Sequence, residues 1–326
     1  MGEGELGRKS MKKPKLIVMV GLPGSGKSTY AKELVKNKKA DIILSSDAIR
    51  EELTGDENNQ TVNDKVFKLL YQRMNGCLSD GKNVVVDATN TTLKSRLRIM
   101  SECKVDCTKE AIVVNPTVLE CYKRDSSRDR TVSEQVINRF LSGFQCPQKF
   151  EGFDSIKFTE KKTHSTSLSD IINRMKEFDQ ENPHHIFSLG KHCLMLELEL
   201  KKLGIVNSSI LYAGLIHDVG KLFTKNKDDK GIAHYYNHDS IGTYYIVSHY
   251  KTFFFDKDVK DPLLTIFLVN YHMRAHKDFK TPKAENKYRK LFGNELYELL
   301  ISFGGCDMKA TGTYENHEQI MEEINK

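Results

Sequence analysis

The sequence predicts an α/β domain, with a parallel sheet flanked by helices, followed by an all-α domain. In the first half, short β-branched runs alternate with stretches of helical periodicity, which is the pattern of βαβ units. In the second half the β-branched runs become rare and one helical stretch follows another. A length of 326 residues accommodates two domains, because single hydrophobic cores stop growing at roughly 250–300 residues.

Five runs have the composition of buried strands, and a polar segment separates them from the second half. The runs are residues 16–20 (LIVMV), 41–44 (DIIL), 83–88 (NVVVDA), 111–115 (AIVVN) and 155–158 (SIKF). Residues 159–167 (TEKKTHSTS) have no apolar periodicity, so we expect a linker with the domain boundary at residue 162. The expected organisation is a flexible leader over residues 1–12, a first domain over 13–162 and a second domain over 163–326.

Six stretches of the second half have helical periodicity. They cover residues 169–178, 189–203, 210–222, 238–250, 263–272 and 291–303. Because β-branched clusters are sparse between them, we expect this domain to be helical throughout.

Composition and charge exclude several classes of protein. Hydrophobic residues make up 39% and charged residues 29%, which is a globular rather than a disordered composition. No apolar run approaches the roughly 20 residues of a membrane helix, and the first residues lack the apolar segment of a signal peptide, so we expect a cytoplasmic protein with no membrane partner. Seven scattered cysteines favour reduced thiols over a disulfide framework. The net charge of +6 is compatible with binding a phosphate backbone but does not require it.

Residues 21–29 (GLPGSGKST) match the Walker A pattern, between a predicted strand and a predicted helix. Glycines in such a loop let backbone N–H groups approach triphosphate oxygens, and the helix N-terminus adds partial positive charge. Lys27 is expected to reach the β and γ phosphates of ATP, and Ser28 to hold Mg²⁺. The predicted nucleotide-binding residues of the loop are Gly24, Ser25, Gly26, Lys27, Ser28 and Thr29.

Asp47 and Arg50 lie one helical turn apart in SSDAIREEL, after the second predicted strand. A carboxylate at this place can take the proton from an attacking hydroxyl, and a guanidinium can hold a phosphate of the acceptor. The alternative is structural, with Asp47 capping a helix and Arg50 solvated on its surface. The spacing alone favours neither interpretation.

Two further segments carry polar residues suited to phosphoryl transfer. Asp87 ends a predicted buried strand, where ligands bind in open α/β sheets, and could position Mg²⁺ or substrate. Thr89 and Asn90 follow it and could hydrogen-bond a polar substrate. The segment KRDSSRDR carries Arg124 and Arg128, which could close over the transferring phosphoryl group. A solvated charged segment is the usual alternative.

Five segments together resemble the kinase domain of the phage-type polynucleotide 5′-kinase family, namely GLPGSGKST, SSDAIR, VVVDATN, KRDSSR and PQKFEGFDSI, within residues 13–160. The resemblance implies that Asp47 is the general base on a 5′-hydroxyl and that Arg50 holds the neighbouring phosphate of the acceptor strand. It also implies that Arg128, with Arg124 nearby, acts from a lid, and that ATP and Mg²⁺ are the cofactors.

The segment LYAGLIHDVGKL, residues 211–222, places His217 and Asp218 at the end of an apolar stretch. Adjacent helical residues point about 100° apart, so the two can share a metal ion only if other groups complete its shell. His192 on the preceding predicted helix and Asp307 on a late one are available. Two imidazoles and two carboxylates suit a divalent transition metal, or Mg²⁺ with bound water.

This order of ligands and the motif LIHDVGK resemble the HD phosphohydrolase superfamily, over residues 178–312. The resemblance implies a metal-dependent phosphodiesterase or phosphatase that uses an ion such as Mn²⁺, Ni²⁺, Co²⁺ or Fe²⁺. A second ion would be bound by His238, in NHDSIG, and His272, in NYH, with Asp218 bridging; one ion and two ions both stay open. Further phosphate contacts are expected among Lys221, His184, His185, His234 and Arg274.

A kinase and a metal-dependent phosphohydrolase in one chain fit a substrate with two ends to repair. The leading hypothesis is an end-healing enzyme that phosphorylates the 5′-hydroxyl of RNA or DNA and hydrolyses a 2′,3′-cyclic phosphate or a 2′/3′-phosphate at the other end. No ligase-like lysine motif is visible, so sealing would need a separate RNA ligase. The alternatives are a nucleoside or small-metabolite kinase fused to a nucleotidase, and an ATP-dependent switch joined to a ligand-sensing helical domain.

Overall fold

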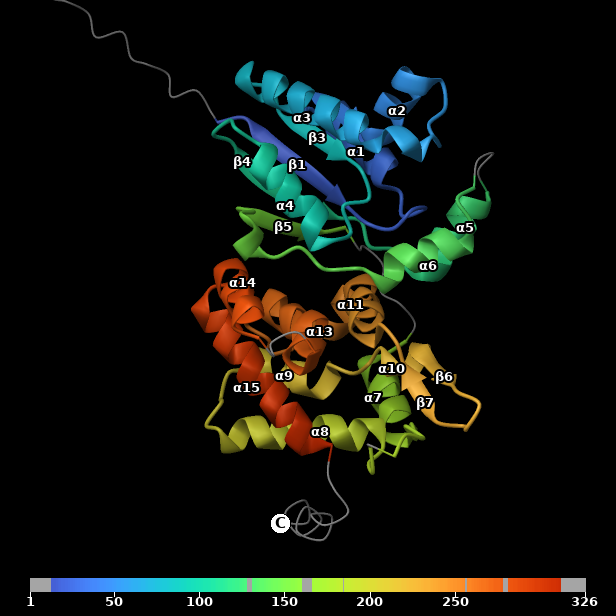
Figure 1. Ribbon diagram of the computed structural model, residues 1–326, viewed down its shortest axis with the longest axis vertical. Helices are drawn as coiled ribbons and strands as arrows, with labels where there is room; N and C mark the ends of the chain where they lie inside the picture. Colours follow the sequence, from blue (N-terminus) through green and yellow to red (C-terminus); the bar gives the residue numbers. More distant parts are fainter. Residues whose placement is uncertain are drawn as a thin grey trace, which may run out of the picture.

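The structure is a computed structural model. It describes residues 13–127, 131–159, 166–183, 185–255, 257–277 and 281–311. A sheet with its helices forms one end of the molecule and a helical assembly forms the other (Figure 1).

The N-terminal part is built on a five-stranded parallel sheet. Its strands are β1 (Lys15–Val20), β2 (Ile42–Ser45), β3 (Val84–Asp87), β4 (Thr108–Val113) and β5 (Ser155–Phe158), in the spatial order β2-β3-β1-β4-β5. All four neighbouring pairs run parallel. The predicted α/β architecture is therefore confirmed, because each β-branched run forms one strand and each crossover contains a helix.

Side chains alternate between the two faces of this sheet, and each face is covered by helices. Ile17 and Met19 of β1 pack with α1 (Lys27–Lys36), whereas Val18 points to the opposite face. That opposite face packs against α3 (Asn63–Ser79) and α4 (Leu93–Glu102). The remaining helices of this part are α2 (Ser46–Thr54), α5 (Val118–Ser126) and α6 (Glu134–Ser142), with the short 3-10 turns η1 (Gln60–Val62) and η2 (Lys149–Glu151).

The C-terminal part is mainly helical. Its helices are α7 (Leu168–Glu177), α8 (Leu189–Lys202), α9 (Ser208–Ile216), α10 (Lys221–Thr224), α11 (His238–Ser248), α12 (Tyr250–Phe254), α13 (Pro262–Lys277), α14 (Pro282–Phe292) and α15 (Asn294–Ala310). None of the described helices combines the length and the apolar character needed to cross a membrane.

The expectation that this part is entirely helical was wrong at one place, an antiparallel hairpin of β6 (Lys225–Lys227) and β7 (Ala233–Tyr235). Its turn is closed by Asp228, whose carboxylate accepts hydrogen bonds from two backbone N–H groups. Gly231 in the turn has φ 77°, a left-handed conformation that favours glycine. The turn-forming residues Asp228 and Gly231 therefore determine a hairpin here, although the surrounding sequence is helical.

Two predicted helices are each divided in the structure. The stretch 210–222 contains α9 and α10, joined by a turn over residues 217–220. A Cβ at Gly220 would lie 2.0 Å from the carbonyl oxygen of His238, so only glycine lets this turn contact α11. The stretch 291–303 is interrupted at Gly293, whose φ of 83° and ψ of 161° end α14 and start α15.

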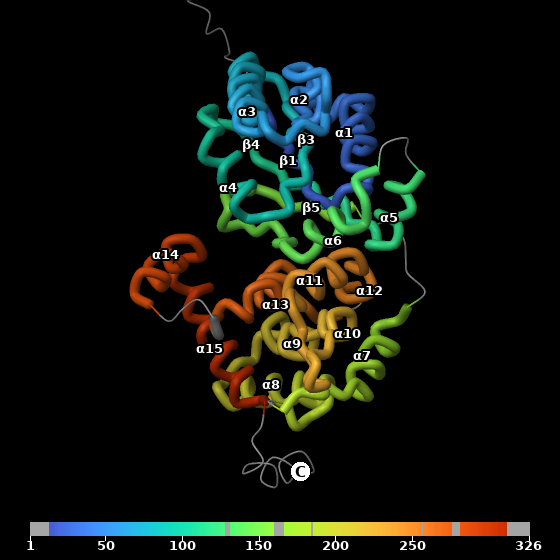
Figure 2. Tube along the Cα trace, turned by 45° about the vertical axis from the view of Figure 1, so that its right-hand side comes forward, coloured from blue at the N-terminus to red at the C-terminus, as the bar shows by residue number. Residues whose placement is uncertain are grey.

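The sheet part and the helical part are packed together through a continuous core cluster. Tyr244 of α11 contacts Phe144 edge to face, with ring centroids 5.0 Å apart, and its hydroxyl donates to the carbonyl of Pro116. The side chain of Asn115, after β4, donates to the carbonyl of Val247 at 2.6 Å. Figure 2 shows α11 lying directly beneath α6. These contacts hold the two parts in a defined relative position, while the domain boundary at residue 162 lies outside the described residues and stays a prediction.

Candidate functional site

The Walker A loop connects β1 to α1 and is shaped by glycines. Gly24 has φ 74° and Gly26 has φ 94°, and Gly26 is the N-cap of α1. A Cβ at Gly24 would lie 2.4 Å from the carbonyl oxygen of Cys121 in α5. The loop therefore requires glycine at this position both for its conformation and for its close approach to α5.

The polar groups of the loop surround the start of α1. The ammonium of Lys27 donates to the carbonyl of Leu22 at 2.8 Å and lies 3.5 Å from the hydroxyl of Ser25. Ser28 and Thr29 are exposed in the first turn of α1, which carries no acidic residue. Exposed hydroxyls, a lysine and a free helix N-terminus form a site suited to a metal-bound triphosphate.

One of the two predicted lid arginines contacts this loop. The Nη1 of Arg124 donates to the carbonyl of Ser25 at 2.8 Å. It extends from α5, whose N-terminus is fixed by a capping box between Thr117 and Glu120. Arg128, the other predicted lid residue, lies outside the described residues, so its position stays a prediction.

Asp47 and Arg50 form an ion pair at the start of α2, with Oδ1 and Nη1 2.6 Å apart. The N-cap of α2 is Ser45 rather than Asp47, and the Arg50 side chain is only 5% exposed, so the structural alternative of a capping aspartate and a solvated arginine was wrong. Arg50 also donates to the carbonyl of Glu57 and to the side chain of Asn63. The Asp47 carboxylate is 56% exposed, which leaves it accessible to an acceptor.

Asp87, Thr89 and Asn90 lie at the carboxyl ends of the strands, as predicted from their place after β3. Asp87 is buried and pairs in register with Ser45 of β2, so it lies beside the start of α2. The backbone carbonyl of Thr89 accepts from the N–H of Gly21 at the Walker A loop. Asn90 has φ 47° and donates its side-chain amide to the carbonyl of Met19. Its amide nitrogen therefore supports the loop structurally, which the sequence did not indicate.

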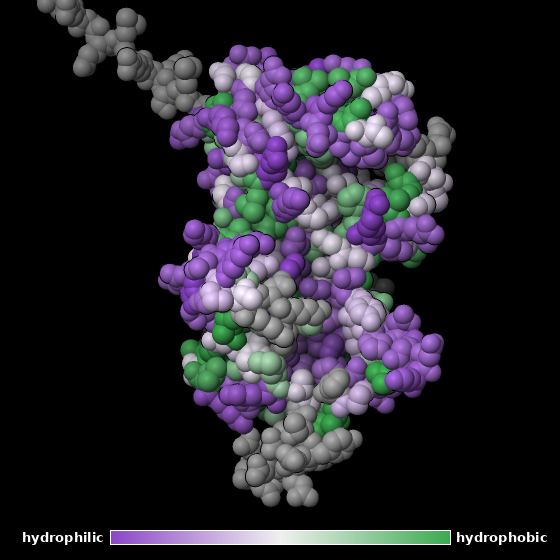
Figure 3. Space-filling view, in the orientation of Figure 1, coloured by the Kyte–Doolittle hydropathy of each residue, from purple (hydrophilic) through white to green (hydrophobic). Residues whose placement is uncertain are grey.

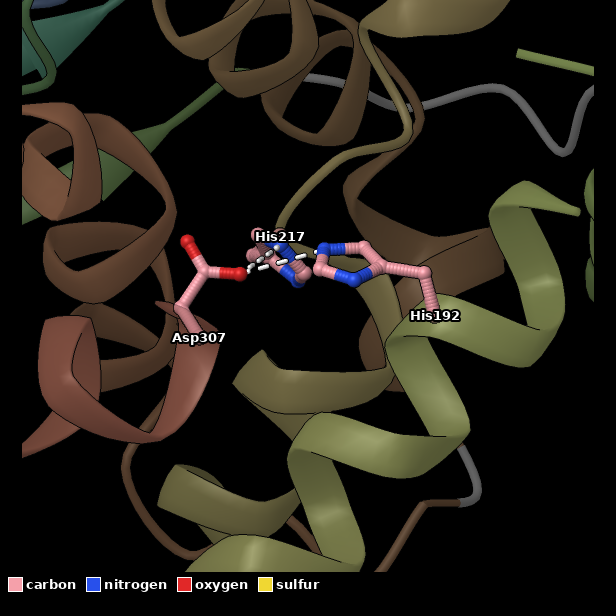
Figure 4. Close-up of side chains that lie close together, drawn as sticks. All are labelled: His192, His217 and Asp307. Carbon is pink, nitrogen blue, oxygen red and sulfur yellow. Dashed lines mark ion pairs between the residues drawn. The ribbon is translucent and has the colours of Figure 1, made fainter. Parts of the chain in front are cut away.

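A second group of predicted residues converges inside the helical part. His192 of α8, His217 at the end of α9 and Asp307 of α15 point toward one another (Figure 4). Asp307 Oδ1 lies 3.1 Å from His192 Nε2 and 3.4 Å from His217 Nε2. All three side chains are buried. Together they form one of two groups in the described chain whose ligand atoms lie within 4.8 Å of one another.

Asp218 joins this group to a second one. Its Oδ2 lies 3.4 Å from His192 Nε2 and 3.3 Å from His217 Nε2. Its Oδ1 faces the other way, 3.1 Å from His238 Nε2 and 3.5 Å from His272 Nε2. The two oxygens of one carboxylate thus face two pairs of imidazoles, which is the arrangement of a bridging ligand.

Backbone hydrogen bonds orient every imidazole of this cluster. In each case the Nδ1–H donates to a backbone carbonyl, so that Nε2 is directed at the carboxylates. The carbonyl partners are Ala310 for His192, Gly214 for His217, Tyr235 for His238 and Val269 for His272. The Nε2 of His217 is buried without a hydrogen-bond partner among the described residues. Four imidazoles oriented in this way fit metal ligands, whose second nitrogen is commonly fixed by a carbonyl.

The imidazoles and carboxylates of the cluster shift one another's pKa. Burial lowers the pKa of His192, but hydrogen bonds and charge attraction from Asp218 and Asp307 raise it overall, to about 9. Burial raises the pKa of Asp218, yet the surrounding cations, His217 first, hold it well below its usual range. A fully charged carboxylate among buried imidazoles is a centre that a divalent cation can occupy by displacing protons.

Of the predicted phosphate contacts, Lys221 lies nearest to the cluster. Its ammonium is 2.7 Å from Asp218 Oδ2 and donates to Gln180, a buried residue that the sequence did not single out. His185 has a buried Nδ1 without a partner among the described residues, and burial lowers its pKa to about 3.

Two other predicted contacts have partners elsewhere, and one cannot be placed. His234 is on β7 and its Nε2 lies 3.1 Å from Asp228 across the hairpin. Arg274 of α13 contacts the hydroxyl of Tyr288 at 3.5 Å. His184 lies outside the described residues. Among the described residues, these two contacts do not lead to the cluster, and the assignment of His234 and Arg274 as phosphate contacts stays a prediction.

Comparison with known proteins concerns the N-terminal part of the chain. Residues 16–147 match the family model described as an AAA domain. The chain is 27% identical over 180 residues to the L-seryl-tRNA(Sec) kinase of Methanococcus maripaludis, a match covering 51% of this chain and 66% of that protein, just under two thirds of its length. Residues 16–147 therefore form a P-loop kinase-like domain.

Solved structures give weaker likenesses. A chain from a structure of the Pnkp1/Rnl/Hen1 RNA repair complex is 23% identical, with 50% of this chain and 55% of that chain covered and a TM-score of 0.40. A putative kinase from Chloroflexus aurantiacus is 17% identical, with 46% and 86% covered and a TM-score of 0.36.

Proposed function

We propose that the chain is a bifunctional nucleic-acid end-healing enzyme, which phosphorylates 5′-hydroxyl ends with ATP and removes phosphate from 2′,3′-cyclic, 2′ or 3′ ends in a metal-dependent reaction. The observation that carries the proposal is the presence of both machineries in one chain. The P-loop after β1 and the exposed Asp47 carboxylate after β2 both lie at the carboxyl edge of one parallel sheet, and four oriented imidazoles surround Asp218. The relative named for an RNA acceptor, L-seryl-tRNA(Sec), supports RNA as the substrate class.

In the first reaction, Asp47 takes the proton of the 5′-hydroxyl as its oxygen attacks the γ-phosphorus of ATP. The bond from that phosphorus to the β–γ bridging oxygen breaks, and ADP leaves. Lys27, in the loop, and Arg124, which contacts it, neutralise charge on the transferring group, and Ser28 would hold Mg²⁺. Arg50 orients Asp47 and holds the adjacent phosphate of the acceptor; its buried Nε–H has no acceptor among the described residues.

In the second reaction, the cluster around Asp218 would hold one or two divalent ions, which supply an activated water and neutralise phosphate charge. The residues that fit as ligands are His192, His217, Asp218, His238, His272 and Asp307. Lys221 lies beside Asp218 and can bind a phosphate oxygen of the substrate. His185, kept neutral by burial, can accept or donate a hydrogen bond there.

The direct test uses a short RNA with a 5′-hydroxyl and a 2′,3′-cyclic phosphate, incubated with ATP, Mg²⁺ and Mn²⁺, with both ends analysed by mass spectrometry. We expect phosphate gained at the 5′ end and lost at the other. Phosphorylation of nucleosides with the RNA unchanged would favour the alternative of a nucleoside or small-metabolite kinase fused to a nucleotidase. Binding of ATP without turnover at either site would favour the alternative of an ATP-dependent switch joined to a ligand-sensing helical domain.

Separate variants assign the two reactions. Asp47→Asn is expected to abolish 5′ phosphorylation with ATP binding retained, because only the proton acceptor is removed. Asp80→Asn, at an exposed carboxylate beside Lys82, is the matched control. If the Asp47→Asn variant still phosphorylated 5′ ends, Asp47 could not be the general base.

Asp218→Ala is expected to abolish phosphate removal and leave 5′ phosphorylation unchanged, because the cluster lies in the helical part. Loss of both activities would instead point to a folding defect, which circular dichroism and thermal unfolding would reveal. Phosphate removal at the wild-type rate by this variant would contradict the assignment of the cluster.

A further inference from the structure

A groove runs between α3 and α4 on the face of the sheet opposite α1. It consists of two hollows of about 740 and 560 Å³, which share the side chains of Phe67, Tyr71 and Arg98 and are therefore continuous. The acidic residues among their lining are Asp64 and Glu102.

The groove reaches the carboxyl edge of the sheet, where the proposed kinase site also lies. On α3, Phe67, Tyr71 and Asn75 are spaced four residues apart and line one side of the groove. Asn63 does not line the groove, but it directly precedes the lining residue Asp64 and accepts a hydrogen bond from Arg50 at 2.9 Å. On the opposite wall, Asn90 and Thr92 lie just after β3, at the edge of the sheet where Asp87 ends. The groove therefore leads away from the Asp47–Arg50 pair along the sheet.

Its lining combines aromatic surface with positive charge. The rings of Phe67 and Tyr71 lie 6.0 Å apart at 34°, with Phe67 partly exposed and Tyr71 forming the floor. The lining contains four cationic residues and two acidic ones, so its net charge is positive; the cations are Lys68, Lys94, Arg98 and Lys104. Arg98 forms an ion pair with Glu102. Aromatic side chains for bases and cations for phosphates are the two elements of sites for single-stranded nucleic acid.

We propose that this groove binds the single strand of the acceptor polynucleotide that follows the reacting 5′ nucleotide. The inference rests on the proposed 5′-kinase activity and adds where the rest of the strand lies. A base stacks on Phe67, and the phosphates contact Lys94 and Arg98. The part of α3 that lines the groove, from Asp64 to Asn75, is about 17 Å long at 1.5 Å per residue, which spans at most about five nucleotides at ~3.4 Å per step.

The length of the acceptor provides the first test. We expect kcat/KM for 5′-hydroxyl oligonucleotides to rise from the nucleoside 3′-phosphate to an oligomer of about five nucleotides and then to level off. Double substitution Lys94→Ala with Arg98→Ala is expected to raise the KM for a decamer about tenfold or more. Nucleoside 3′-phosphates serve as the internal comparison, because they are too short to reach the groove. Lys32→Ala, an exposed lysine on α1 across the sheet, is the matched control.

A binding measurement separates this inference from the kinase proposal. Fluorescence anisotropy with a labelled single-stranded decamer is expected to show weaker binding by the double variant. The slope of the logarithm of its binding constant against the logarithm of the salt concentration should decrease by about one for each phosphate contact that is lost. A Phe67→Leu variant should lose affinity while Phe67→Tyr keeps it, because only the second retains an aromatic face. Wild-type decamer binding and KM in the double variant would overturn the groove assignment while leaving 5′ phosphorylation intact. A protein that binds the decamer through the groove but phosphorylates no 5′ end would contradict the kinase proposal instead.

Discussion

The buried ion pair between Arg96 and Glu151 offers a sharp test of the packing that supports the first site. Arg96 donates from Nε and Nη2 to the two carboxylate oxygens of Glu151, at 2.7 and 2.8 Å, and both side chains are fully buried. Its Nη1 donates to the carbonyl of Asn90, so the pair also fixes the loop after β3. Glu151→Gln would leave the guanidinium buried without a counter-charge.

The expected cost follows from that geometry. Removing one partner of a buried ion pair destabilises a protein by about 3–5 kcal/mol. For a domain of this size each kcal/mol lowers Tm by about 2–4 °C, so we expect a decrease of about 6–20 °C. Burial raises the pKa of Glu151 although Arg96 opposes the shift, so desolvation of the carboxylate outweighs its attraction to the guanidinium. The intact ion pair should therefore add little to the free energy of unfolding beyond what an apolar pair at the same place would contribute.

Thermal and urea unfolding of three proteins measure this: wild type, Glu151→Gln, and the double variant Arg96→Met with Glu151→Leu. We expect the single variant to lose the stated stability and the double variant to recover most of it. A single variant as stable as wild type, or a double variant less stable than the single one, would refute the reasoning.

Three other predictions concern the sites and the contact between the two parts. Gly24→Ala should reduce ATP affinity by tenfold or more in a nucleotide-binding titration, because its Cβ would lie 2.4 Å from a carbonyl oxygen, whereas Gly76→Ala, in open space on α3, should not. Addition of Mn²⁺ to metal-free protein at pH 7.5 should release protons, because the neighbouring carboxylates raise the pKa of His192 to about 9 and this imidazole must lose its proton to bind metal. Calorimetry in buffers of different ionisation enthalpy measures the release. Binding heats that do not depend on the buffer would contradict this prediction. Tyr244→Phe should lower the free energy of unfolding by about 1–3 kcal/mol, because the carbonyl of Pro116 loses its buried donor, and the exposed Tyr236→Phe serves as the control; equal stability of the two variants would contradict the role of this contact.

Much of the first site could be anticipated because its signals are local. The Walker A loop depends on glycines at left-handed positions, and the strands depend on runs of β-branched residues. Both kinds of signal are read within a few neighbouring residues. The burial of Arg50 was not predictable in this way, because it depends on Glu57 and Asn63, which the chain brings back after a turn.

The second site was predicted as a set of residues but not as an arrangement. The types and places of the residues in the sequence named His192, His217, Asp218 and Asp307, yet their distances arise from the packing of α8, α9 and α15. Gln180, which holds Lys221, lies in a segment without a motif and was missed. The breaks at Gly220 and Gly293 were also missed, because a glycine in a helical pattern is ambiguous until its neighbours in space are known.

By itself the sequence determined the α/β pattern of the first part and the mainly helical second part, and it named the candidate groups of both sites, because alternation, glycine placement and residue type are local properties. The tertiary structure alone decided that Asp218 presents one oxygen to each pair of imidazoles, that Arg50 is buried against Asp47, and that Phe67 and Tyr71 form a groove with residues of α4. These features join residues far apart in the chain, and only the packing of helices on a common core brings such residues within contact distance.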